Sequence, residues 1–166
     1  MRPGLRTGMT TLVAGVGNVF LGDDGFGVAV ARRLIAAGVP DGVRVGDFGI
    51  RGIHLAYELT SGYDLTILVD AAPSGLAPGT LSVVAPASPD AEPAFVDAHA
   101  MTPEAVLTLA SGLDLPWGGR VLLVGCEPAD VTPGMDLSPP VAAAVPDAAD
   151  LVLALITQEF AKEAGR

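Results

Sequence analysis

The sequence is poor in cysteine and in basic residues, and each shortage excludes something. With a single cysteine, Cys126, no disulfide can form within the chain. Lysine and arginine together number 9, against 19 aspartates and glutamates, which gives a formal net charge of −10. Nucleic acids and anionic membranes bind proteins through basic patches, so we expect neither as a partner.

Neither a signal peptide nor an uninterrupted apolar run of membrane-spanning length stands out in the sequence. Half of the 166 residues are apolar and 17% are charged, a composition typical of a folded globular chain. We interpret residues 1–9 as a disordered leader and residues 10–166 as a single α/β domain. The expected location of the protein is the cytoplasm.

One stretch, residues 11–30, organises the rest of the chain. Its apolar run at residues 12–14 breaks into GVGN (residues 15–18), and a helical pattern resumes at Val28. Between them, GDDG (residues 22–25) places two carboxylates side by side with no basic residue next to them. We interpret this turn as part of a cation-binding site at one end of an α/β sheet.

Apolar periodicity predicts strands at about 10–14, 43–48, 65–69, 80–84 and 121–125, and helices at about 24–37, 52–60, 102–111 and 139–161. Pro146 is expected to kink the last helix or to restart it at Asp147. Residues 71–79 are too few for a parallel crossover, so the fourth strand should run antiparallel at an edge. The predicted fold is a three-layer sandwich, with helices on both faces of a mostly parallel, twisted five-stranded sheet.

Acidic residues follow the ends of the predicted parallel strands. Asp24 follows the first strand, Asp47 ends the second, Asp70 ends the third, and Glu127 lies just beyond the last. Ligands of open α/β sheets bind outside the carboxyl ends of the strands, so these side chains should share one rim. Crowded carboxylates stay ionised together when a cation compensates them, which favours a metal ion at this rim.

Several of these residues also have a structural interpretation. Asp23 suits an N-cap or dipole-stabilising position at the start of the first helix better than a ligand position. Asp47 fits a turn cap through Gly49 as well as it fits a functional role. Phe20 is expected to pack in the core, with a substrate groove as the alternative, and Cys126 to be a small buried residue rather than a nucleophile.

A dinucleotide site is an alternative to a metal site. The GVG motif after a strand, with Asp47 at the end of the next strand, partly imitates the Rossmann fingerprint. However, Phe20 stands where that fingerprint has its third glycine. Asp23 and Asp24 would also place negative charge where a pyrophosphate needs an open helix N-terminus.

Seven stretches together resemble the hydrogenase maturation proteases, which process the large subunits of [NiFe] hydrogenases. In chain order they are GVGNVFLGDDGFGV (15–28), DFGIRG (47–52), LVDA (68–71), PGTL (78–81), DAHAMTPEAVL (97–107), VGCEP (124–128) and LSPPV (137–141). The resemblance covers about residues 10–155. It implies an endopeptidase that removes a C-terminal extension from the large-subunit precursor once nickel has been inserted.

The resemblance also implies Asp24, Asp70 and His99 as metal ligands. The metal would be the substrate's own nickel, with Zn²⁺ or Cd²⁺ as substitutes in vitro. Two carboxylates and an imidazole accept such ions and leave coordination positions open. The metal could polarise the scissile carbonyl or activate a water, or nickel could anchor the substrate while a carboxylate such as Asp47 acts as general base. Asp24, Asp70 and Asp47 are therefore the expected catalytic residues.

Asn18 and Gly49 are the expected substrate-binding residues. One departure concerns the Asp-Gly-Gly that usually follows the second strand in this family, because here the sequence is Asp47-Phe48-Gly49. Phe48 carries a side chain where relatives have none. This departure keeps a second hypothesis open, a metal-checking chaperone of the same fold that does not cleave.

Overall fold

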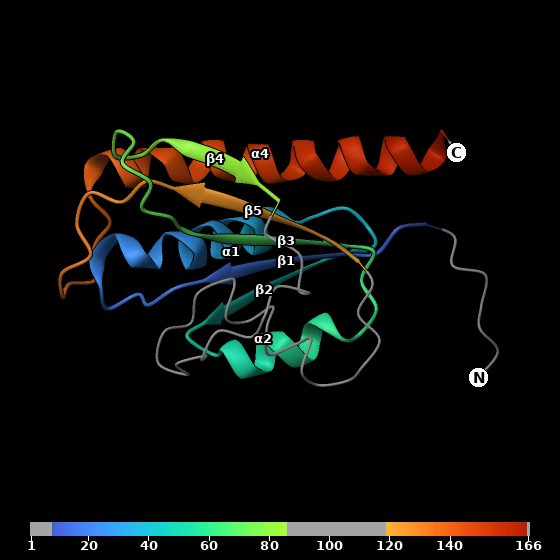
Figure 1. Ribbon diagram of the computed structural model, residues 1–166, viewed down its shortest axis with the longest axis horizontal. Coiled ribbons are helices and arrows are strands. Elements are labelled where there is room, and N and C mark those ends of the chain that lie inside the picture. Colours follow the sequence, from blue (N-terminus) through green and yellow to red (C-terminus); the bar gives the residue numbers. More distant parts are fainter. Residues whose placement is uncertain (1–7, 86–118, 166) are drawn as a thin grey trace.

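The computed structural model describes residues 8–85 and 119–165 of the chain (Figure 1). The described elements are β1 (Thr11–Val16), the 3₁₀ helix η1 (Gly22–Gly25), α1 (Phe26–Ala37), β2 (Val43–Gly49), α2 (Gly52–Leu59), β3 (Leu65–Ala71), β4 (Leu81–Val84), β5 (Arg120–Cys126) and α4 (Pro139–Ala164). The helix predicted at 102–111 and residues 1–7 of the predicted leader lie outside the described residues.

Within the described ranges, five strands form one sheet in the order β2-β1-β3-β5-β4. β1 pairs in parallel with both β2 and β3, and β3 pairs in parallel with β5. β4 pairs antiparallel with β5 at the edge of the sheet. The prediction of a mostly parallel sheet with an antiparallel fourth strand at one edge is confirmed, because the short connection after β3 leaves no room for a crossover.

Helices cover both faces of the sheet, as predicted (Figure 1). α1 and α4 lie on one face, where Phe26, Leu34 and Val152 belong to the larger of two apolar clusters. α2 lies on the other face, where Leu55 and Leu59 belong to the smaller cluster. The sheet between them is the middle layer, so its loops remain at the ends of the sandwich.

The last helix, α4, runs unbroken from Pro139 to Ala164 with Pro146 inside it. Of the two expected outcomes, a kink at Pro146 or a restart at Asp147, the restart is therefore wrong. Ala144 and Ala148, on either side of the proline, are buried in the cluster shared with α1, and such tertiary packing outweighs one lost main-chain hydrogen bond. By length and composition α4 could also cross a membrane, but here its buried residues pack one face of the helix against the core cluster.

The first helix begins later than predicted, at Phe26 instead of Asp24, because residues 22–25 form η1. α1 then packs closely on the sheet through Gly27. A Cβ atom on Gly27 would collide with the main-chain oxygens of Val16 and Val69, near the ends of β1 and β3. The glycine thus brings the start of α1 against the carboxyl ends of two strands.

Candidate functional site

The loops that follow β1, β2, β3 and β5 meet at one end of the sheet, on the left in Figure 1. Asp24 lies in η1 after β1, while Asp47 and Asp70 lie near the ends of β2 and β3. Parallel strands place their carboxyl ends at one edge, so three of the expected site residues share this rim. We call this end of the sheet the acidic rim.

Asp24 and Asp70 converge on Gly17. A Cβ atom on Gly17 would collide with the main-chain oxygen of Asp24 and would lie 3.4 Å from Asp70 Oδ1. Gly17 also has a φ of +132°, which side chains of L-residues rarely tolerate. The turn therefore needs glycine here because two acidic segments close on it.

The carboxylate of Asp24 is oriented by the turn itself. The main-chain N–H of Asn18 donates a 2.8 Å hydrogen bond to Asp24 Oδ2. The side-chain oxygen of Asn18 accepts a 2.9 Å bond from the main-chain N–H of Phe20. Asn18 therefore holds the turn together with its side chain, and its role in substrate binding stays a prediction.

Asp47 and Gly49 lie beside the same turn. The N–H of Gly17 donates to the carbonyl of Gly49 at 3.0 Å, and Gly49 has a φ of +53°. Asp47 Oδ2 pairs with Nε of Arg32, on α1, at 3.2 Å. A general base at Asp47 would thus work beside a guanidinium group.

Phe48, the departure from the family pattern, lies at an irregularity in β2. Asp47 is opposite Gly15 and Gly49 is opposite Val16, so Phe48 is the extra residue of a bulge. Its ring packs against Gly46 and against the apolar cluster beneath α2. The additional side chain therefore contributes to the core on the α2 face.

Asp23 differs from its neighbour Asp24 in that it is fully buried and serves as an anchor. It accepts hydrogen bonds from the main-chain N–H groups of Ala129 (2.8 Å), Asp130 (3.0 Å) and Ser138 (2.7 Å), and from the Ser138 hydroxyl (2.8 Å). The N-cap of α1 is Gly25, without a side-chain hydrogen bond. The prediction that Asp23 caps α1 is wrong, because its partners lie in the β5–α4 loop.

The hydrogen bonds to Asp23 also decide its charge. Burial alone would raise its pKa, but the bonds from Ser138, Asp130 and Ala129 outweigh burial and lower the pKa below its ordinary value. Asp23 is therefore an ionised carboxylate that needs no cation beside it.

Glu127, expected among the acids of the rim, is a second anchor. It is buried and accepts hydrogen bonds from the N–H (2.7 Å) and hydroxyl (2.9 Å) of Ser74 and from the N–H of Gly75 (3.3 Å). The bond from the Ser74 main chain is the main cause of its lowered pKa. Glu127 therefore fixes the β3–β4 loop.

Cys126 is buried, as predicted. Burial, together with the negative charges of Asp23 and Glu127, raises the pKa of its thiol to about 11. A buried thiol with this pKa is almost entirely protonated at neutral pH, so it cannot serve as a nucleophile.

Of the three expected metal ligands, the structure brings Asp24 and Asp70 to one place, whereas His99 lies outside the described residues. Within residues 8–85 and 119–165 there is no group of three or more histidine, cysteine, aspartate or glutamate side chains placed to hold a metal ion. A metal at the acidic rim would need a further ligand from outside these ranges. The assignment of Asp24, Asp70 and His99 as ligands stays a prediction.

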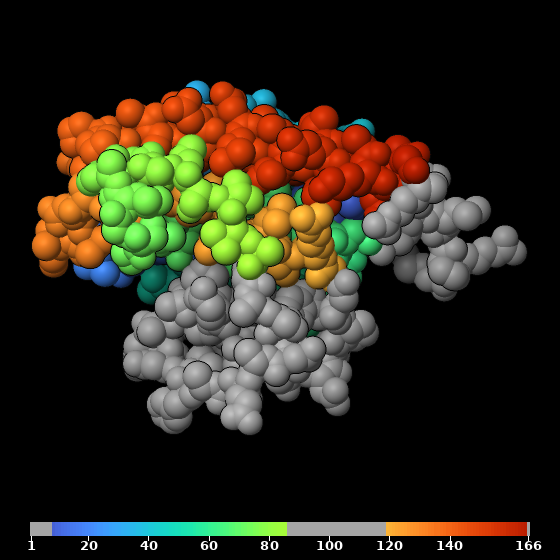
Figure 2. All heavy atoms as spheres, turned by 45° about the horizontal axis from the view of Figure 1, so that its top comes forward, coloured from blue at the N-terminus to red at the C-terminus, as the bar shows by residue number. Residues whose placement is uncertain are grey.

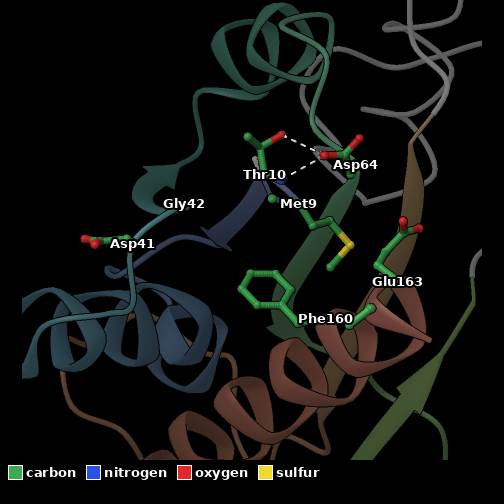
Figure 3. A pocket seen from close by; sticks show the side chains of 9 residues that line it. Met9, Thr10, Asp41, Gly42, Asp64, Phe160 and Glu163 are labelled. Carbon is green, nitrogen blue, oxygen red and sulfur yellow. Dashed lines mark hydrogen bonds between the residues drawn. The ribbon is translucent and has the colours of Figure 1, made fainter. Parts of the chain in front are cut away.

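A cavity of about 880 Å³ lies at the opposite end of the sheet (Figure 3). It is lined by Met9, Thr10, Phe160 and Glu163, among others. Asp64 also lines it, and its Oδ2 accepts 2.8 Å and 3.2 Å bonds from the N–H and hydroxyl of Thr10. This cavity is separate from the acidic rim.

Phe20, expected to pack in the core, is 62% exposed on the turn that carries Asp24. The main chain of Phe20 accounts for this position, because its carbonyl accepts a 2.9 Å bond from the N–H of Gly134 in the β5–α4 loop. Sequence reasoning missed both this pairing and the two anchoring carboxylates, because their hydrogen-bond partners lie between 52 and 115 positions away in the chain.

The chain is similar in sequence to proteins of hydrogenase maturation. The family model described as hydrogenase maturation protease matches residues 28–155. The hydrogenase expression/formation protein HupM of Azotobacter chroococcum is 36% identical over 154 residues, covering 89% of this chain and 71% of that protein. A putative hydrogenase maturation protease of Methanocaldococcus jannaschii is 33% identical over 150 residues, covering 86% of this chain and 93% of that protein.

Solved structures show the same likeness. The hydrogenase maturating endopeptidase HybD from E. coli superposes with a TM-score of 0.75 at 28% identity, covering 91% of this chain and 94% of that chain. The hydrogenase 2 maturation peptidase from a Thaumarchaeota archaeon gives a TM-score of 0.68 at 33% identity, covering 89% of this chain and 98% of that chain.

Proposed function

The chain belongs to the hydrogenase maturation protease family, and from this premise we propose that it removes the C-terminal extension of a [NiFe]-hydrogenase large-subunit precursor after nickel insertion. Because the family is one of proteases, peptide hydrolysis is the activity that the acidic rim is expected to perform. Membership in this family also disfavours the dinucleotide-binding alternative. Phe48 packs beneath α2, and the non-cleaving chaperone stays the second hypothesis, which the cleavage assay tests.

The observation that carries this proposal is the convergence of Asp24 and Asp70 on Gly17. Asp24 and Asp70 come from separate segments, and Asp70, near the end of β3, is 8% exposed. Two carboxylates that bind at one site repel each other, and a positive charge between them offsets that repulsion. The nickel of a loaded precursor would bring that charge, with His99 as the third ligand.

In the proposed mechanism, nickel held by the substrate is the recognition element. Asp24, oriented by the N–H of Asn18, and Asp70 would hold the loaded site so that the adjoining peptide lies along the rim. Asp47 would take the proton from the water that attacks the scissile carbonyl carbon, and the C–N bond would break as the departing amine is protonated. A precursor without nickel would lack this anchor and would remain uncut.

The test uses purified protein with nickel-loaded and nickel-free precursor, and mass spectrometry of the large subunit as the readout. We expect shortening of the loaded precursor alone, and its loss in Asp24→Asn, Asp70→Asn and His99→Ala. Asp41→Asn is the matched control, because Asp41 is exposed at the opposite end of the sheet. Retained cleavage in all three of these variants would contradict the proposal.

The same assay tests whether Asp47 is the general base or only a structural residue of the turn that follows β2. If Asp47 is the general base, Asp47→Asn should bind the loaded precursor like the wild type while its kcat falls by about 10²–10⁴-fold. If kcat is unchanged, the base lies elsewhere.

A further inference from the structure

Several large apolar side chains are exposed near the acidic rim, and three of them come from two segments that are hydrogen-bonded to each other. Phe20 is 62% exposed on the β1–η1 turn, and Val131 and Met135 are 50% and 69% exposed on the β5–α4 loop. Figure 2 shows this loop, in orange, at the left end of the molecule. We call Phe20, Val131 and Met135 the apolar platform.

The platform has a fixed backbone beneath it. Gly134 donates to the carbonyl of Phe20 at 2.9 Å and accepts from the N–H of Gly22 at 2.7 Å. The four hydrogen bonds to the buried carboxylate of Asp23 brace the same loop. Because the loop is already ordered, a partner that docks on it would avoid most of the entropic cost of ordering it.

The platform is continuous with the candidate site. The N–H of Phe20 donates to Asn18 Oδ1, and the N–H of Asn18 donates to Asp24 Oδ2. A substrate protein whose nickel site is held at Asp24 would therefore have part of its surface near Phe20. Exposed apolar side chains in such a position are typical of a protein-binding surface.

The surroundings of the platform indicate the chemistry of the partner. Residues 17–25 and 127–138 contain no lysine or arginine, whereas Asp130 and Asp136 are exposed on the β5–α4 loop. A complementary surface would present apolar side chains bordered by basic ones. We propose that the platform docks the folded body of the large-subunit precursor through such a surface, an inference that rests on the proposed function.

The test compares Phe20→Ser, Met135→Ser and the double variant with Ile35→Ser as the matched control. Ile35 is 54% exposed at the far end of α1, away from the rim. We expect KM for a nickel-loaded precursor to rise about tenfold in the double variant, with kcat at saturation within about twofold of the wild type, as for the loss of an interface anchor. Ile35→Ser should leave KM and kcat unchanged.

Direct binding of the precursor, measured by calorimetry, separates this inference from the proposed function. If the wild type binds the precursor without cutting it and the double variant binds about tenfold more weakly, the docking proposal is supported and the proposed proteolytic function is contradicted. If the wild type cuts the precursor and the double variant has the same KM, the platform proposal is overturned. It is equally overturned if Met135→Ser converts a dimer to a monomer and leaves KM unchanged, because a second copy then occupies the platform.

Discussion

Replacing Asp23 with asparagine should destabilise the protein more than the same change at Asp24, although the two residues are neighbours. Asp23 is fully buried and accepts four hydrogen bonds, three of them from main-chain N–H groups. Asparagine has nearly the same shape, but its amide group would point N–H donors at N–H donors. Asp24, in contrast, is half-buried and its Oδ2 accepts one main-chain bond from Asn18.

The magnitude follows from these contacts. A hydrogen bond to a charged group contributes about 1.5–3 kcal/mol, so four would set a ceiling of about 6–12 kcal/mol. Ala129 and Asp130 are exposed, so water can replace part of what is lost, and asparagine avoids the cost of burying a charge. We expect a loss of about 3 kcal/mol for Asp23→Asn and about 1 kcal/mol for Asp24→Asn.

The pH dependence gives a second measurement of the same contacts. The pKa of Asp23 is lowered in the folded protein, so its contribution is fully present above the unfolded pKa of about 3.9 and is lost as the pH falls through the lower folded value. The wild type should therefore lose stability over this acidic range, and Asp23→Asn should lose less. Above pH 5 the difference between the two proteins should be constant.

Urea-induced unfolding, followed by circular dichroism at pH 7, would measure the free energy of unfolding of the wild type, Asp23→Asn and Asp24→Asn. A midpoint for Asp23→Asn equal to that of the wild type, or a larger loss in Asp24→Asn, would refute the assignment of Asp23 as the anchor of the β5–α4 loop. Cleavage assays on the same samples add the converse expectation, since Asp24→Asn should lose activity while it stays folded.

Two further predictions concern Gly17 and Cys126. Gly17→Ala should lower the free energy of unfolding by about 2–3 kcal/mol and abolish cleavage, because its Cβ would collide with the main chain of Asp24. Gly62→Ala is the control for backbone strain alone, because Gly62 has a φ of +88° and open space around its Cβ. It should lower the free energy of unfolding by about 1–2 kcal/mol in the same urea titration. Cys126, with a thiol pKa of about 11 and full burial, should resist a maleimide at pH 7 until urea unfolds the chain, and rapid labelling of the folded protein would contradict its placement.

The sequence predicted most of the fold because the relevant signals are local. Apolar periodicity located all five strands, and the length of the linker after β3 indicated the direction of β4. The behaviour of Pro146 was not predictable in this way. Whether a proline breaks a helix depends on how firmly the flanking turns are packed, and here Ala144 and Ala148 are buried against the core.

The candidate site could be predicted in part. Asp24 and Asp70 were expected on one rim because parallel strands end together, and the structure places both against Gly17. The different role of Asp23 was missed because its partners are 106 to 115 positions away in the chain. Glu127 lies just after β5, as expected, but its hydrogen bonds from Ser74 were not foreseen, because Ser74 lies 53 positions before it in the chain.

The two anchored carboxylates change how the negative charge of the rim should be counted. Main-chain N–H groups compensate the negative charges of Asp23 and Glu127, and the guanidinium of Arg32 compensates the charge of Asp47. A cation at the rim is therefore attracted less strongly than the number of acidic residues there suggests. If the protein binds the nickel of its substrate as proposed, weak binding is an advantage, because the nickel must stay with the large subunit when that subunit dissociates.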